Sequence, residues 1–535
     1  MADMKAASTA MPGSPVPSTA GGRRLGLALT IIIFAVVCMS RAAVFPASIW
    51  EQDEAYFAAA VVEIDISDSS PHPPFFPLWI GLGKVLHLSG FEPASSLQVA
   101  SAVLGSWMFL PLVVLWSRFM RPALATAAAA LGLAVPGVWL LSGRAFSGTA
   151  ATAFLVMALA CWTRADPGRR WVAAGSLAAG LAVLIRPHFG LVVAVLMLVM
   201  LARFPRRQWL ALIAPAVGVT IAGATAFVIA AGGSSAVTAA LSRHAALHFG
   251  ALPTAGRGLL DSGLVQVLGH PIAAVAWCGL AIWGASVALR STAQRGASLP
   301  VIAALISVLV LVFGLSNPGH PRYAVPLVIL SCGFVVIGID RVLSERWVPV
   351  AVAAAVVGAA VVVLPAATTY RRVESPPLRA LAHADWLATQ RECVVVVDRS
   401  LHSFVLYREA TGASSAPTIF DHLLEQGTSP PPPVSRAVMV FDGDHGELLI
   451  ASESQQTFTC RQEVLRRLAQ DRFLDVTVAD GATLENRFVS DGSWLGALRH
   501  LQEGGQLTVV ENLHGVLLYA SWTDATRLRP LDLAR

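Results

Sequence analysis

The chain of 535 residues is 55% hydrophobic and only 13% charged. Soluble domains carry about 25% charged residues, so this composition excludes a single soluble globule, a disordered chain and a disulfide scaffold. The charge is also uneven. Residues 1–365 hold 22 Lys and Arg against 12 Asp and Glu (+10), whereas residues 366–535 hold 16 against 21 (−5). We therefore expect a basic membrane part followed by an acidic part in water.

The first residues and the apolar segments outline the membrane part. Residues 1–22 are small and polar, and we expect a disordered cytoplasmic tail there. Arg23 and Arg24 then precede the first apolar run. A signal anchor and a cleaved signal peptide both begin in this way, and the many apolar segments that follow favour the anchor. Eleven segments suit a bilayer core of about 30 Å. They lie at residues 25–45, 95–117, 122–141, 148–163, 171–186, 189–203, 208–231, 268–289, 299–315, 323–339 and 347–365.

Basic residues in the loops set the expected orientation. With a cytoplasmic N-terminus, 15 of the 22 basic residues before residue 366 fall on the inner side, as the positive-inside rule requires. We therefore predict a mainly α, polytopic protein of the inner or plasma membrane, with about 11 transmembrane helices over residues 23–365. Pro and acids interrupt the apolar stretches of the first outer loop, residues 46–94, which predicts helices at the membrane interface.

The odd number of spans places residues 366–535 outside the cytoplasm. Strand-like runs occur there at residues 393–397, 437–441, 473–479, 507–511 and 516–520. Residues 461–470 are amphipathic and fit a helix between strands, so we predict a soluble, mixed α/β domain. Its two cysteines are Cys393 and Cys460. A disulfide and two buried free thiols are both compatible with this spacing.

Two motifs of the first outer loop bear chemical groups. Residues 50–57 (WEQDEAYF) place adjacent carboxylates, Asp53 and Glu54, just after the first span. Carboxylates at a membrane surface are costly unless they are solvated or used, although acids in a first helical turn also complement the helix dipole. Residues 71–79 (PHPPFFPLW) form a proline-rich loop that carries His72 into an apolar helix. Alone, this second motif indicates no more than a turn with an exposed histidine.

Taken together, the two motifs resemble the first outer loop of C-type (GT-C) glycosyltransferases. The resemblance is strongest to the bacterial branch of lipid A aminoarabinose transferases, protein O-mannosyltransferases and rhizobial galacturonosyltransferases. It extends to residues 142–146 (SGRAF), 185–188 (IRPH) and 320–326 (HPRYAVP), and it covers residues 25–340 in order.

The resemblance implies an integral membrane glycosyltransferase. Such an enzyme moves a hexosyl or pentosyl group from a polyprenyl phosphate donor to a glycolipid, an envelope glycan such as lipopolysaccharide or cell-wall glycan, or a protein, by inverting displacement outside the cytoplasm. Residues 23–365 would then be its catalytic domain. The family's first-loop base falls on Asp53, with Glu54 beside it. Cations must stabilise the leaving phosphate. The candidate substrate-binding residues are Arg322, Arg186, His320, His72, Arg144, His188 and Tyr323.

Arg322 is the first choice for the phosphate, and an interfacial anchor is the alternative reading of this residue. An inverting displacement places the base and the cations on opposite sides of the anomeric carbon, about 6–9 Å apart by analogy with inverting glycosidases. We therefore expect Asp53 to face Arg322 across a cavity.

Relatives often carry a second acid in the outer loop before the fourth span. Residues 144–149 (RAFSGT) contain no carboxylate at that place, so we expect no obligatory metal and no other cofactor. No P-loop, Rossmann or zinc-binding pattern occurs in the sequence, and no nucleic acid partner is expected.

Two other functions stay open from the sequence. A transporter or flippase of lipid-linked or anionic solutes would carry ionisable residues within its spans, whereas those of this chain lie at the span ends. A membrane-anchored binding or assembly protein is the third possibility.

Overall fold

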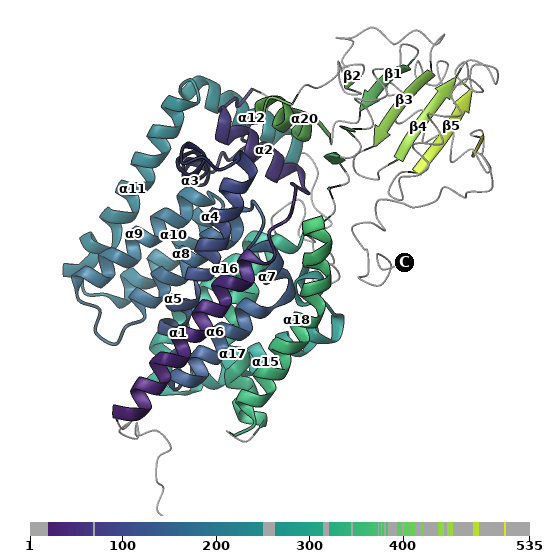
Figure 1. Cartoon of the computed structure of the whole chain (residues 1–535). Helices are drawn as coiled ribbons and strands as arrows, with labels where there is room; N and C mark the ends of the chain where they lie inside the picture. Colours follow the sequence, from purple (N-terminus) through teal and green to yellow (C-terminus); the bar gives the residue numbers. More distant parts are fainter. Residues whose placement is uncertain are drawn as a thin grey trace, which may run out of the picture.

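The structure is a computed structural model (Figure 1). It describes residues 20–67, 70–249, 263–313, 320–343 and 346–372, short segments between 374 and 413, and strands between 393 and 509. The helices before residue 250 are α1 (Ala20–Ala42), α2 (Gln52–Val62), α3 (Pro77–Leu88), α4 (Pro93–Trp107), α5 (Phe109–Trp116), α6 (Pro122–Ala134), α7 (Pro136–Leu141), α8 (Ser147–Trp162), α9 (Arg169–Ile185), α10 (Phe189–Arg203), η1 (Arg206–Gln208), α11 (Trp209–Ala230) and α12 (Ser234–Phe249). Those after it are α14 (Val265–Leu268), α15 (Pro271–Arg290), α16 (Thr292–Phe313), α17 (Pro321–Val342), α18 (Val348–Arg372) and α20 (His402–Ala410).

Each of the eleven apolar segments overlaps one helix or two consecutive helices among the described residues. By length and composition, six helical stretches among the described residues could cross a membrane. They are Pro93–Trp116, Arg206–Ala230, Pro271–Arg290, Thr292–Phe313, Pro321–Val342 and Val348–Arg372. Shorter apolar helices are Ala28–Ala42, Pro122–Ala134, Ser147–Trp162 and Phe189–Arg203. The chain is therefore mostly helical and multi-pass, and the number of eleven spans stays a prediction.

Proline begins several of these helices. Pro77, Pro93, Pro122, Pro271 and Pro321 each occupy the first turn of a helix, where the missing N–H costs no hydrogen bond. The break between α6 and α7 has the same origin, because a proline opens α7 directly after Val135.

Helix α17 forms the centre of the bundle. All residues from 324 to 338 on this helix are buried. Glycines allow α15 to approach it closely, because a Cβ at Gly284 would lie 1.9 Å from the Phe334 carbonyl oxygen and one at Gly338 would lie 2.6 Å from that of Leu280. The N-terminal end of this helix carries Arg322 and Tyr323, and His320 is its N-cap residue.

The short helices of the first loop gather at one end of the bundle. In Figure 1, α2, α3, α12 and α20 lie at the upper end, whereas α1 begins at the lower end. Helix α20 packs against α2, and Tyr407 Oη donates a hydrogen bond to Glu92 Oε1. The start of α17 lies at the same end of the bundle, because His320 and Arg322 contact the first-loop acids Glu51 and Asp53.

Six strands are described in the C-terminal part: β1 (Cys393–Val397), β2 (Ile419–Phe420), β3 (Ala437–Asp442), β4 (Glu447–Ser452), β5 (Asp475–Asp480) and β6 (Thr508–Val509). They form one mixed sheet in the order β2-β1-β3-β4-β5-β6. Strands β1, β3, β5 and β6 coincide with four of the predicted strand runs, whereas β2 and β4 were not predicted. The predicted strand at residues 516–520, the helix at 461–470 and Cys460 lie outside the described residues, and the α/β domain stays a prediction.

Two boundaries differ from those expected. Helix α1 begins at Ala20, within the segment expected to be disordered, and residues 1–19 lie outside the described residues. Helix α18 continues beyond residue 365 to Arg372. The extra turns bring Tyr370 close to the first-loop acids. The apolar pattern ends before the helix does, because these turns contain polar residues.

Candidate functional site

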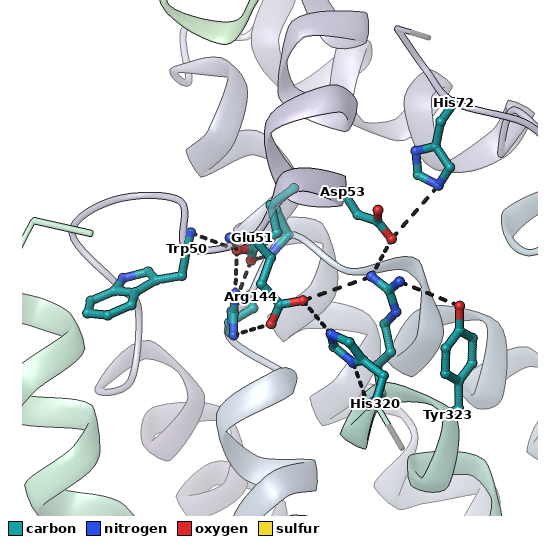
Figure 2. Close-up of polar contacts among 10 residues, drawn as sticks. Trp50, Glu51, Asp53, His72, Arg144, His320 and Tyr323 are labelled. Carbon is teal, nitrogen blue, oxygen red and sulfur yellow. Dashed lines mark hydrogen bonds and ion pairs between the residues drawn. The ribbon is translucent and has the colours of Figure 1, made fainter. Parts of the chain in front are cut away.

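The start of α2 positions three carboxylates. Glu51 is the N-cap residue of α2, and Asp53 and Glu54 lie in its first turn. Glu54 Oε2 accepts hydrogen bonds from the backbone N–H groups of Trp50 (2.9 Å) and Glu51 (3.1 Å), so its side chain turns back over the helix start. Asp53 points in another direction, toward α17 (Figure 2). The neighbouring acids therefore serve different partners.

Glu54 forms a closed pair with Arg144, from the loop between α7 and α8. Arg144 Nη2 donates to Glu54 Oε2 at 2.6 Å and Arg144 Nε to Glu54 Oε1 at 3.1 Å, a bidentate pair. The backbone N–H of Ala145 adds a third donor to Oε1 at 3.0 Å. Glu54 is fully buried, and both of its oxygens are occupied. This carboxylate therefore anchors the α7–α8 loop and has no oxygen left for a substrate.

Glu51 connects Arg144 with the start of α17. Its Oε1 lies 2.9 Å from Arg144 Nη1, and its Oε2 lies 2.8 Å from His320 Nε2 and 3.9 Å from Arg322 Nη1 (Figure 2). Burial acts to raise the pKa of Glu51, but the charges of Arg144 and His320 outweigh it and hold the pKa below its usual range. Glu51 is therefore an anion that three cationic or polar side chains share.

Asp53 pairs with Arg322. Its Oδ2 contacts Arg322 Nη1 in an ion pair and lies 3.8 Å from His72 Nε2 (Figure 2). Burial acts to raise the pKa of Asp53, but the charges of Arg322 and His72 outweigh burial and hold the pKa below its ordinary value. The carboxylate is therefore ionised at neutral pH. In contrast to Glu54, the Asp53 side chain is 24% exposed. A substrate hydroxyl can therefore reach Asp53, as it can Glu51, whose side chain is 27% exposed, but not Glu54.

Aromatic rings surround the two arginines that face Asp53. The Cζ of Arg322 lies 5.1 Å from the ring centroid of Tyr323 and 5.4 Å from that of Phe146. The Cζ of Arg186, at the C-cap of α9, also lies 5.1 Å from the ring centroid of Tyr323. Arg186 is 6% exposed, and it forms neither an ion pair nor a hydrogen bond with any described residue. It is a buried cation that contacts no anion directly, and Asp53 acts on its charge only from a distance.

Two histidines complete the cluster. The His72 ring stacks on Phe57 (5.1 Å between centroids) and lies 5.2 Å from the Phe76 ring. His188, on the other side of Phe76, lies 6.2 Å from the same ring, and burial together with Arg186 lowers the pKa of His188 to about 3. Phe75 and Phe76 adopt positive φ angles of 80° and 51°, which are strained for bulky residues. Such strain is typical of segments that hold a functional side chain.

All nine residues predicted for the site lie around this cluster. Asp53, Arg322, Tyr323, Arg186, His72 and His188 border it. Glu54 and Arg144 are buried and pair with each other, which favours an anchoring role, and the roles that the resemblance implies for them stay predictions. His320 caps α17, since its Nδ1 accepts from the backbone N–H of Arg322 at 3.5 Å, while its Nε2 holds Glu51.

One expected distance is wrong. Asp53 and Arg322 do not face each other across a gap of several ångströms but are in direct contact. The reason is electrostatic, because Asp53 is the nearest carboxylate to Arg322 among the described residues.

Sequence reasoning also missed two residues. Glu51 precedes Glu54 by three positions, a spacing that places both side chains over the same helix start, and this signal could have identified it. Tyr370 lies beyond the apolar pattern of α18. Its ring packs edge-on against Trp50, with 4.5 Å between centroids, and the Cζ of Arg144 lies 5.9 Å from it.

Metal ligation requires several acids or histidines around one point. In the parts of the chain that the structure describes, no three His, Cys, Asp or Glu side chains form a group that could hold a metal ion. Arg144 forms ion pairs with both Glu51 and Glu54. The expectation that no metal is required stays a prediction.

Comparisons with known proteins agree with the sequence resemblance. Residues 77–231 match the Alg9-like mannosyltransferase family. No curated protein sequence matches the chain. The chain is similar to the structure of ArnT from Cupriavidus metallidurans in the apo state (TM-score 0.49, 16% identity, 79% of this chain and 93% of ArnT). It is also similar to the apo Archaeoglobus fulgidus oligosaccharyltransferase (TM-score 0.48, 13% identity, 75% of this chain and 65% of that one). A third similar structure is that of arabinofuranosyltransferase AftD from Mycobacteria (TM-score 0.41, 20% identity, 71% of this chain and 31% of AftD). The predicted resemblance to C-type glycosyltransferases is confirmed.

Proposed function

We propose that this chain, whose residues 77–231 match the Alg9-like mannosyltransferases, is an integral membrane glycosyltransferase. It moves a sugar from a polyprenyl phosphate donor to a glycan, lipid or protein acceptor outside the cytoplasm. The family match supports glycosyl transfer. The lipid phosphate donor is supported by one observation of the site, the buried and unpaired guanidinium of Arg186.

A buried charge without a partner is costly, because the interior does not replace its hydration. Arg186 is 6% exposed and packs on the ring of Tyr323, and the charges of Arg322 and Asp53 reach it without a direct ion pair. An anion that binds at Arg186 would therefore regain the energy lost on burial. The planar guanidinium fork matches a phosphate group, and Arg322 lies beside the same tyrosine ring.

The reaction follows from this placement. Asp53 accepts the proton of the acceptor hydroxyl while that oxygen attacks the anomeric carbon. The bond between the anomeric carbon and the phosphate oxygen breaks, and the polyprenyl phosphate leaves with the electron pair. Arg186 and Arg322 stabilise the charge that develops on the phosphate. His188 is neutral, so it can donate or accept a hydrogen bond near the sugar without adding charge.

Binding of undecaprenyl phosphate to the purified protein tests this proposal. We expect Arg186→Gln to weaken binding by about 100-fold, which corresponds to one buried charge-assisted contact. Arg164→Gln is the matched control, because Arg164 lies before α9 at the end of that helix opposite Arg186. Equal binding by wild type and Arg186→Gln would contradict the role of Arg186. Binding without sugar transfer to any envelope acceptor would instead favour a transporter or flippase.

The location of the site is a separate proposal. Fifteen of the 22 basic residues before residue 366 support a cytoplasmic N-terminus, and thus a site on the extracytoplasmic side. Single cysteines at Arg295 and Gly412 should be labelled by an impermeant thiol reagent from opposite sides of the membrane. Labelling from the same side would contradict the orientation.

A further inference from the structure

The ion pair between Asp53 and Arg322 joins two groups that the proposed reaction must use separately. Asp53 has to accept a proton, and Arg322 has to bind the donor phosphate. A carboxylate that is paired with a guanidinium is a weaker base, and a guanidinium that is paired with a carboxylate offers less to a phosphate. In the structure the two groups block each other.

We propose that Asp53 and the donor phosphate compete for Arg322, so that donor binding transfers Arg322 from Asp53 to the phosphate and thereby frees the base. This inference rests on the proposed function and adds an order of events to it. The donor binds first, and only then does Asp53 become available to the acceptor hydroxyl.

The contacts around Arg322 fit such an exchange. The Nη1 atom that pairs with Asp53 lies 3.9 Å from Glu51 Oε2, so a second carboxylate stays nearby when the first contact is broken. Arg144 and His320 hold Glu51 in place from both sides. Glu51 is therefore a positioning residue, which keeps the guanidinium at the site while its partner changes.

The free face of Arg322 also points to an incoming ligand. Its Nη2 lies 3.5 Å from Tyr323 Oη, a long contact, and its Nε is buried without a hydrogen-bond partner among the described residues. The Cζ of Arg186 lies 5.1 Å from the ring centroid of the same tyrosine, and no carboxylate among the described residues forms an ion pair with it. A phosphate between Arg186 and Arg322 would satisfy both guanidinium groups, whereas Asp53 satisfies only one of them.

The competition predicts a gain of binding on loss of the base. Asp53→Asn removes the competing anion and keeps the side-chain shape. We expect Asp53→Asn to bind undecaprenyl phosphate about tenfold more tightly than wild type, since one partly buried ion pair no longer has to be broken. Its sugar transfer should fall by about 10²- to 10⁴-fold. Glu63→Gln is the matched control, because it removes the same charge from an exposed position at the other end of α2.

Two further variants separate the possible outcomes. The double variant Asp53→Asn with Arg322→Ala should lose the gain, because the released cation is absent. Asp53→Ser serves as a second test of the gain if the Asn variant is unstable in thermal unfolding. Binding by wild type without a gain in either Asp53 variant would overturn the competition and leave the proposed donor intact. No binding by wild type would overturn the donor proposal and the competition with it.

Discussion

Two acid–arginine pairs begin on adjacent residues of α2 and differ in almost every respect. Glu54 and Arg144 form a bidentate pair, and the backbone N–H groups of Trp50, Glu51 and Ala145 complete the hydrogen bonds of the carboxylate. Asp53 and Arg322 share one contact, and their side chains are 24% and 16% exposed. The first pair is saturated and the second is not.

The difference teaches how one helix start serves both structure and chemistry. A fully satisfied buried pair is strongly destabilising to break, so it fixes the loop that carries Arg144. A single, partly exposed contact is worth little in stability and can be exchanged for a substrate group. The same residue types in consecutive positions thus act as an anchor and as a reactive pair.

Asp53→Asn should have the largest effect on activity. We expect sugar transfer to fall by about 10²- to 10⁴-fold, the range for loss of a general base, with a change in unfolding free energy below about 1 kcal/mol. Transfer of sugar to the envelope acceptor is measured in membranes, and thermal unfolding is measured on the purified protein. Full transfer by this variant would show that Asp53 is not the base.

Glu54→Gln should have the largest effect on stability. The substitution leaves Arg144 with Glu51 as its one carboxylate among the described residues, and a broken buried pair costs about 3–5 kcal/mol. Thermal unfolding should therefore move to a much lower temperature, and activity should fall only in proportion to the folded protein. A stable protein with no activity would mean that Glu54 takes part in the chemistry, and that the Glu54–Arg144 pair is not purely structural.

The distinction between these two pairs could not be predicted from the sequence. The motifs of residues 50–57 and 320–326 predicted that acids and arginines meet, because the resemblance fixes their order along the chain. The resemblance also predicted that Asp53 faces Arg322. That Glu54 pairs with Arg144 was not predicted, because this contact depends on the rotation of α2 and on the depth of the α7–α8 loop. Local periodicity contains neither quantity.

The positions of the apolar helices were predicted from the sequence, but the end of α18 was not. Apolar length located the helices, since burial in a bilayer requires it. The end of α18 was placed too early, because residues 366–372 are partly polar and gain their helical form from the preceding turns and from contacts such as that of Tyr370 with Trp50. Such long-range contacts leave no mark on hydropathy.

Arg322→Lys should have a moderate effect. Lysine keeps the positive charge but loses the planar fork, so we expect the KM for the polyprenyl donor to rise about tenfold with little change in thermal unfolding. Arg164→Lys is the matched control and should behave as wild type. An unchanged KM in Arg322→Lys would mean that Arg322 contributes only a point charge, and an unchanged KM in Arg322→Ala as well would remove it from the site.

The pH dependence should show the smallest effect and bears directly on the reactive pair. In the free protein Asp53 faces Arg322, His72, His320 and Glu51, and its pKa lies below the ordinary value of 3.8 because Arg322 and His72 outweigh burial and Glu51. Asp53 is therefore ionised above that value, and kcat/KM should fall only when the pH drops below it. When the donor phosphate draws Arg322 away, the pKa of Asp53 should rise.

The acid limb of kcat, which reports the donor complex, should then lie about one pH unit or more above the acid limb of kcat/KM, which reports the free protein. Glu54→Gln should keep this separation in its folded fraction, because Glu54 and Arg144 do not contact Asp53. Arg322→Ala should bring the two limbs together. Coincident limbs in the wild type would mean that Arg322 stays on Asp53 throughout the reaction, and the two pairs would then differ in exposure but not in function.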